Sequence, residues 1–140
     1  MRAALAILAM LAPACADDPD EVEEVGITET IAEPLELLLA SPIRAGEAFW
    51  VEVRTIGGGC IHYGSTEVFV EEGAPTIIPW DIRFIPGPHE GCLANLLDLR
   101  HRATIMFETP GTNVLRVYGR RRNTDNTYDD VRYDVAIEVD

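Results

Sequence analysis

Residues 131–139 have the sequence VRYDVAIEV, in which the large apolar side chains stand at every second position. A period of two places them on one face of an extended strand, whereas a helix would need spacings of three or four residues. The same alternation occurs in FWVEV at 49–53, in EVFVE at 67–71 and in ATIMFE at 103–108. The chain from residue 31 onward is therefore predicted to consist of strands with one buried face.

Turn-forming residues separate the predicted strands, which are expected near residues 34–40, 47–56, 66–71, 76–84, 102–109, 112–120 and 128–139. Pro79 argues for an edge strand or a bulge, because proline cannot donate a backbone hydrogen bond. The segment CLANLLDLR at 92–100 interrupts the series, and its leucine spacing favours a short helical turn. The sequence thus predicts an all-β fold, an immunoglobulin-like antiparallel β-sandwich of about seven strands.

Composition and charge restrict the class of protein. The chain has 140 residues, of which 47% are hydrophobic and 25% charged, as in a globular protein with one domain. Acidic residues outnumber basic ones 24 to 11, which gives a net charge of −13. A nucleic-acid partner would require a basic face that displaces counterions from phosphates. A nucleic-acid partner is therefore not expected.

The first residues have the pattern of an export signal. Residues 1–16 read MRAALAILAMLAPACA, with one positive charge at Arg2 followed by an apolar run from Ala3 to Ala12. Such a run suits a signal peptide and is too short to span the ~30 Å hydrocarbon layer of a membrane. We therefore expect a helical signal peptide over residues 1–15 and an exported mature protein.

Two cleavage sites are compatible with this signal. Residues 12–15, APAC, resemble a bacterial lipobox, in which Cys15 would become lipidated and N-terminal, although Ala12 stands where leucine is usual. Alternatively, residues 14–16, ACA, fit ordinary signal peptidase, which would cut before Asp17 and release a soluble protein. We favour lipidation of Cys15, with the membrane as a partner of the mature chain.

The segment after Cys15 is strongly acidic. Residues 16–30 contain seven carboxylates and few apolar side chains, and like charges keep such a stretch extended and solvated. The sequence predicts an acidic flexible linker over 16–30 that joins the anchor to a sandwich domain at 31–140.

Cys60 and Cys92 are the cysteines that remain in the mature chain apart from Cys15. In an oxidising compartment they are expected to form a disulfide, and both lie in glycine-rich connections that can meet its geometry. The alternative is a tetrahedral metal site formed by Cys60, His62, His89 and Cys92, whose spacing matches no zinc finger.

Other polar groups give weaker signals. Side-chain oxygen atoms stand at alternate positions from Asn123 and Asp125 to residue 129, as they do in calcium-binding loops. The glycine and the glutamate that an EF-hand calcium loop requires are missing. The histidine at position 101 is interpreted as a packing or capping residue, and the arginine run at 120–122 as balancing nearby acids. Motifs for nucleophilic catalysis, phosphate binding or dinucleotide binding do not occur. We therefore expect a non-enzymatic protein without a cofactor.

Several segments together resemble a known group of proteins. They are AGEAFWVEVRTIGGGC at 45–60, STEVFV at 65–70, PWD at 79–81, Cys92, His101 and PGTNVLRVYGR at 110–120. This set is similar to small uncharacterised bacterial lipoproteins with one immunoglobulin-like domain. The resemblance covers roughly residues 45–122. It implies export to the cell envelope and a β-sandwich, and it brings no established activity or partner.

Overall fold

The computed structural model describes residues 20–140, which form nine strands. They are β1 (Glu21–Val25), β2 (Ile27–Thr30), β3 (Leu37–Leu39), β4 (Ala48–Gly57), β5 (Ile61–Glu71), β6 (Ala74–Phe84), β7 (Leu97–Met106), β8 (Gly111–Arg122) and β9 (Tyr128–Val139). Within residues 20–140 no helix is long and apolar enough to cross a membrane. The expected signal peptide at 1–15, with Cys15, lies outside the described residues.

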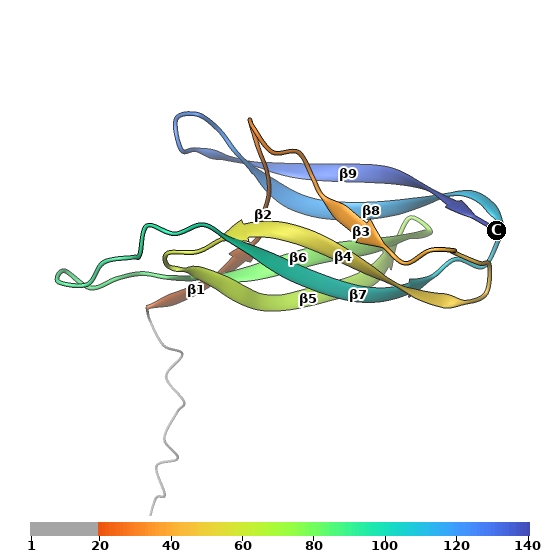
Figure 1. Ribbon diagram of the computed structural model, residues 1–140, viewed down its shortest axis with the longest axis horizontal. Helices are drawn as coiled ribbons and strands as arrows, with labels where there is room; N and C mark the ends of the chain where they lie inside the picture. Colours follow the sequence, from red (N-terminus) through yellow and green to blue (C-terminus); the bar gives the residue numbers. More distant parts are fainter. Residues whose placement is uncertain (1–19) are drawn as a thin grey trace, which may run out of the picture.

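The strands form two sheets that lie one over the other (Figure 1). The small sheet has the order β3-β4-β7 and is antiparallel. The large sheet contains β1, β2, β5, β6, β8 and β9, with β5–β6 and β8–β9 as antiparallel pairs. The fold is therefore all-β and sandwich-like, as the alternating pattern predicted.

The hydrophobic core lies between the two sheets. In β4 the side chains of Phe49, Val51 and Val53 are buried, while Trp50 between them is exposed. Alternate residues are also buried on β7, β8 and β9, and β6 contributes Ile77. The main core residues outside β4 are Ile77, Ala103, Ile105, Phe107, Leu115, Val117, Ile137 and Val139. The period-two pattern therefore selects the side chains that face the opposite sheet.

The prediction of a flexible linker over 16–30 is wrong for residues 21–30, which form β1 and β2. Two of their four acids, Glu24 and Glu29, are matched by arginines distant in sequence. Glu24 contacts Arg83 at 3.2 Å and Arg120 at 2.9 Å, and Glu29 contacts Arg121 at 2.9 Å. Carboxylates paired in this way no longer repel one another, so the segment can join the sheet.

β1 and β2 lie between β6 and β8. β1 pairs antiparallel with β6, and β2 pairs parallel with β8. The change of partner occurs at Gly26, where an added Cβ would approach the Thr55 side chain to 2.5 Å and the Asp81 carboxylate to 2.7 Å. Glycine is therefore required at this crossing point for steric reasons.

Pro79 does not lie in an edge strand, because β6 has β5 on one side and β1 and β8 on the other. The Pro79 carbonyl accepts a hydrogen bond from the Gly26 N–H. The Pro79 nitrogen, which has no hydrogen to donate, points to the same side as this carbonyl and so faces the break between β1 and β2. The neighbouring strand β5 has a register shift between Tyr63 and Ser65, opposite Asp81 and Trp80. A partner change and an adjacent bulge thus accommodate the proline.

Two further predictions need correction. The segment 92–100 has no helical turn: its first part is an irregular loop, and from Leu97 it forms β7, paired with Gly57 at the end of β4. The sandwich is also not purely antiparallel, since β2 and a short part of β6 run parallel to β8. The two strands formed by residues 21–30 raise the number of strands in the described part from about seven to nine.

Candidate functional site

The structure contains the disulfide that the sequence predicted, between Cys60 and Cys92. Their Cα atoms are 5.1 Å apart, within the usual range for such a bond. Cys60 lies in the turn between β4 and β5, and Cys92 lies in the loop between β6 and β7. The bond therefore ties the longest irregular loop of the described chain to a tight turn.

The alternative metal site is not formed. The two sulfur atoms are bonded to each other, so neither is a thiolate that could bind zinc. His62 and His89 are both exposed. No group of three or more histidine, cysteine, aspartate or glutamate side chains in residues 20–140 is arranged to hold a metal ion.

A second polar group lies buried around His101 of β7. Its Nε2 atom is 2.9 Å from Asp81 Oδ1 and 3.1 Å from Thr55 Oγ1. Its Nδ1 atom donates to the Ser65 carbonyl at 3.0 Å and is 3.3 Å from Thr66 Oγ1. Three neighbouring strands, β4, β5 and β6, thus supply polar partners to one imidazole ring.

The His101–Asp81 pair is closed to solvent. The exposed fractions of the two side chains are 0% and 1%. The Tyr63 ring stacks on the imidazole with 4.7 Å between ring centroids. A catalytic imidazole must contact its substrate, and this ring is buried. The geometry is therefore suited to holding strands together rather than to proton transfer. The interpretation of His101 as a packing residue agrees with this arrangement.

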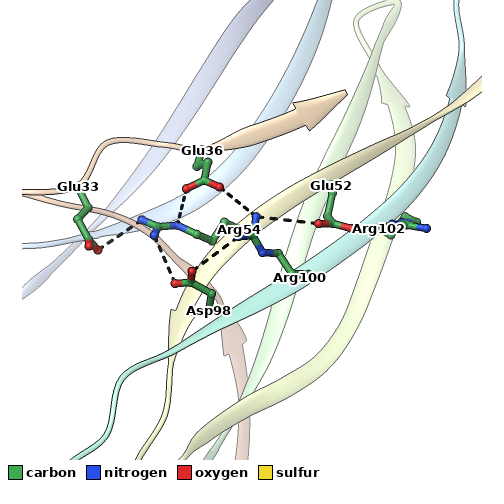
Figure 2. Close-up of polar contacts among 7 residues, drawn as sticks. All are labelled: Glu33, Glu36, Glu52, Arg54, Asp98, Arg100 and Arg102. Carbon is green, nitrogen blue, oxygen red and sulfur yellow. Dashed lines mark hydrogen bonds and ion pairs between the residues drawn. The ribbon is translucent and has the colours of Figure 1, made fainter. Parts of the chain in front are cut away.

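The outer face of the small sheet carries a network of ion pairs (Figure 2). Its centre is Arg54 of β4, whose side chain is 11% exposed and lies 3.4 Å from Glu33, 3.3 Å from Glu36 and 3.3 Å from Asp98. On β7, Arg100 contacts Glu36 at 3.0 Å. The network fastens the segment between β2 and β3 onto the small sheet.

The same network continues along this outer face toward Trp50. Arg102 of β7 contacts Glu52 of β4 at 3.0 Å, and its guanidinium lies 4.9 Å from the centre of the Trp50 ring. The seven residues drawn include four carboxylates and three guanidinium groups: Glu33, Glu36, Glu52, Asp98, Arg54, Arg100 and Arg102. Every one of these guanidinium groups has a carboxylate partner, so the face offers no free cation to an anionic ligand.

The arginine run 120–122 also faces protein groups. Arg120 pairs with Glu24, and Arg121 pairs with Glu29 at 2.9 Å. Arg122 donates to the Asn126 side chain at 2.6 Å. The interpretation that this run balances nearby acids is confirmed for its first two members.

Glu29 receives a hydrogen bond from the hydroxyl of Tyr133 on β9 as well as from Arg121. The hydrogen bond from Tyr133, and after it the one from Arg121, hold the pKa of Glu29 below its usual value of 4.5. Burial, followed by the contact with Glu29, raises the pKa of Tyr133 to about 12. The two groups connect β2 with β9 across β8.

The variant Tyr133→Phe is expected to lose stability in a pH-dependent way. Because the pKa of Glu29 is lower in the folded than in the unfolded chain, its contribution is present above about pH 4.5 and disappears as the pH falls through the folded pKa. In urea unfolding at about pH 6, the variant should therefore have a lower free energy of unfolding than the wild type. This difference should become smaller as the pH is lowered. Tyr128→Phe is the control, since the ring of Tyr128 lies over Arg120. A constant difference at every pH would contradict the prediction.

A shallow hollow lies at the end of the sandwich opposite the disulfide. Its volume is about 480 Å³, and Val70, Pro75, Met106 and Phe107 form its apolar part. Glu108, Thr109 and Asn113 add polar groups at one side. The hollow has no cluster of titratable side chains, so it offers a surface for contact and no recognisable chemistry.

Comparisons with known proteins do not identify the chain. The functional argument therefore rests on the sequence and on the structure of residues 20–140, and the resemblance to bacterial lipoproteins stays a prediction. No family model, no curated protein and no solved structure matches this chain.

Proposed function

We propose that this protein is exported to a bacterial cell envelope, is anchored in a membrane by a lipid on Cys15, and acts there as a non-enzymatic binding or structural module facing the periplasm or the cell exterior. The observation that carries the proposal is the N-terminal pattern. One arginine, a short apolar run and small residues precede Cys15, and acids follow directly. The alternative is ordinary cleavage before Asp17 and a soluble secreted protein.

The disulfide supports export. Bonds of this kind persist in oxidising compartments such as the periplasm and the cell exterior, and they are rare in the cytosol. The bond between Cys60 and Cys92 closes a loop of 32 positions in a small domain. Export through a signal sequence would bring the chain into a compartment where this bond is stable.

A non-enzymatic role is supported by the state of the polar groups. The buried His101–Asp81 pair cannot meet a substrate, and the arginines of the outer face of the small sheet are engaged by carboxylates. Accessible features of the described residues include the apolar loop after β6 and the shallow hollow near Val70. Both are suited to contact with a partner or a surface.

The proposed architecture is immunoglobulin-like in arrangement only. Two facing sheets with an apolar core between them and antiparallel pairs β4–β7 and β8–β9 favour this description. The parallel pairing of β6 with β8 departs from it, since an immunoglobulin domain has antiparallel sheets.

The anchor is tested by the variant Cys15→Ser of the full chain, expressed in a bacterium. Wild-type protein should partition with membranes and carry the mass of a lipid on its N-terminal peptide. The variant should appear in the soluble fraction or remain an unprocessed precursor, because serine offers no thiol to the lipid. Ala16→Ser, which keeps Cys15, serves as the control and should behave like the wild type. Recovery of soluble wild-type protein that begins at Asp17 would refute the anchor and leave the secreted alternative.

A further inference from the structure

The loop between β6 and β7, residues 85–96, exposes an unusual amount of apolar surface together with the first residue of β7. The side chains of Leu93 and Leu96 are 77% and 78% exposed, the highest values among the large hydrophobic residues of the described chain. Ile85 and Leu97 at the two ends of the loop are 42% and 50% exposed. Leucines with this exposure contribute little to the core, and several exposed apolar side chains in one loop are suited to a contact surface.

The base of this loop is fixed on the rest of the domain. The disulfide joins Cys92 to Cys60 in the turn after β4. The Asn95 side chain accepts a hydrogen bond from the Gly59 N–H at 2.8 Å. At Gly58, where φ is +99°, a Cβ would collide with the Asn95 carbonyl oxygen, so the turn and the loop are in close contact. The leucines are therefore presented on a constrained base, which reduces the entropy lost when they bind.

The loop lies beside the point where the described chain begins. The Asp20 carbonyl accepts a hydrogen bond from the Ile85 N–H at 2.6 Å, and β1 continues along β6 from there. In Figure 1, the start of β1 and the loop after β6 lie at the same end of the sandwich, away from the C-terminus. Cys15 precedes Asp20 by five positions, which span at most ~17 Å even when fully extended. A lipid on Cys15 would therefore hold this end of the domain close to the membrane.

The chemistry of the loop is suited to a bilayer. Residues 85–97, IPGPHEGCLANLL, include a single charged side chain, Glu90, in a chain with a net charge of −13. A loop without arginine or lysine lacks the side chains that usually bind an anionic headgroup, whereas leucines gain free energy by leaving water for the acyl-chain boundary. The expected contact is therefore apolar and independent of anionic lipid.

We infer that the loop 85–97 is a second membrane contact, in which Leu93 and Leu96 enter the interfacial layer of the bilayer that holds the Cys15 lipid. This inference rests on the proposed lipid anchor and deepens it. One acyl anchor alone leaves the domain free to rotate, whereas two contacts at the same end fix its orientation. The far end of the sandwich, with the hollow near Val70, then points away from the membrane.

The inference is tested with the lipidated protein, which begins at Cys15, in phosphatidylcholine vesicles whose acyl chains are brominated near the headgroups. Bromine quenches tryptophan fluorescence at short range, so it reports which residue enters the bilayer. The variant Leu93→Trp places the probe in the loop. The matched control is Val70→Trp, because Val70 is 71% exposed and lies at the opposite end of the sandwich. Both substitutions are at exposed positions, and an unchanged melting temperature shows that the fold is kept.

The added emission of Leu93→Trp should fall by about half or more in brominated vesicles, while that of Val70→Trp should not change. An unquenched Leu93→Trp, or equal quenching of both variants, would overturn the loop contact and leave the lipid anchor standing. A wild-type chain without lipid on Cys15, measured by mass spectrometry, would overturn the anchor and the loop contact together. The two failures are therefore distinguished by the mass measurement.

Discussion

Reduction of the Cys60–Cys92 disulfide, or its replacement in the double variant Cys60→Ser/Cys92→Ser, is expected to lower the melting temperature by about 10 °C or more. The bond closes a loop of 32 positions, and removing it restores the conformational freedom of that loop in the unfolded chain. Loop-closure entropy of this size corresponds to ~3–4 kcal/mol at 25 °C. The folded state should persist at low temperature, because the core between the sheets does not include the two cysteines.

The measurement is thermal unfolding followed by circular dichroism, with and without reductant, together with thiol titration of the denatured protein. The double variant should melt at the same temperature in both conditions, which makes it the control for direct effects of the reductant. If the wild-type protein melts identically with and without reductant and a chelator lowers its stability instead, the disulfide prediction is contradicted. The site formed by Cys60, His62, His89 and Cys92 would then have to be reconsidered.

The variant His101→Ala is expected to have the second large effect, a loss of about 3 kcal/mol or more in the free energy of unfolding. The imidazole is the common partner of Asp81, Thr55 and Thr66; its contacts with Asp81 and Thr55 are buried, and its contact with Thr66 is partly buried. Its removal leaves the Asp81 carboxylate buried without a partner, since the other carboxylate oxygen has none in the folded protein. The truncation also leaves a cavity.

His62→Ala is the matched control, because His62 is exposed on β5 and makes no side-chain hydrogen bond in the described structure. Its free energy of unfolding should stay within about 0.5 kcal/mol of the wild-type value. Asp81→Asn keeps the shape of the side chain and should cost less than His101→Ala. Urea unfolding monitored by tryptophan fluorescence measures all three variants. A His101→Ala variant as stable as His62→Ala would show that the ring does not hold the three strands together.

The longer strands were predictable because their alternation is strict. The expected strands at 47–56 and 128–139 correspond to β4 (Ala48–Gly57) and β9 (Tyr128–Val139). Burial of one face determines the pattern there, and the pattern can be read locally. The alternation also indicated that His101 is buried, because His101 occupies the same inward-facing set of positions on β7 as Ala103 and Ile105.

The errors concern residues whose surroundings are assembled from distant parts of the chain. Charge density predicted that Glu24 and Glu29 lie in a solvated linker, but their arginine partners follow them by more than fifty positions. Leucine spacing predicted a helical turn near Leu96, but the loop is held by Asn95 against the turn at Gly59 and continues into a strand paired with β4. Neither contact has a local signature in the sequence.

The place of β1 and β2 also affects the order in which the chain can fold. These strands are the first of the described chain, yet their partners β6 and β8 come much later. Without them, β6 and β8 meet only at Thr76 and Ile77. Pairing of such distant segments is slow, because a large loop must close before any contact stabilises it. In a chain that emerges N-terminus first, β2 would therefore lack the strand it pairs with until Arg122 had emerged.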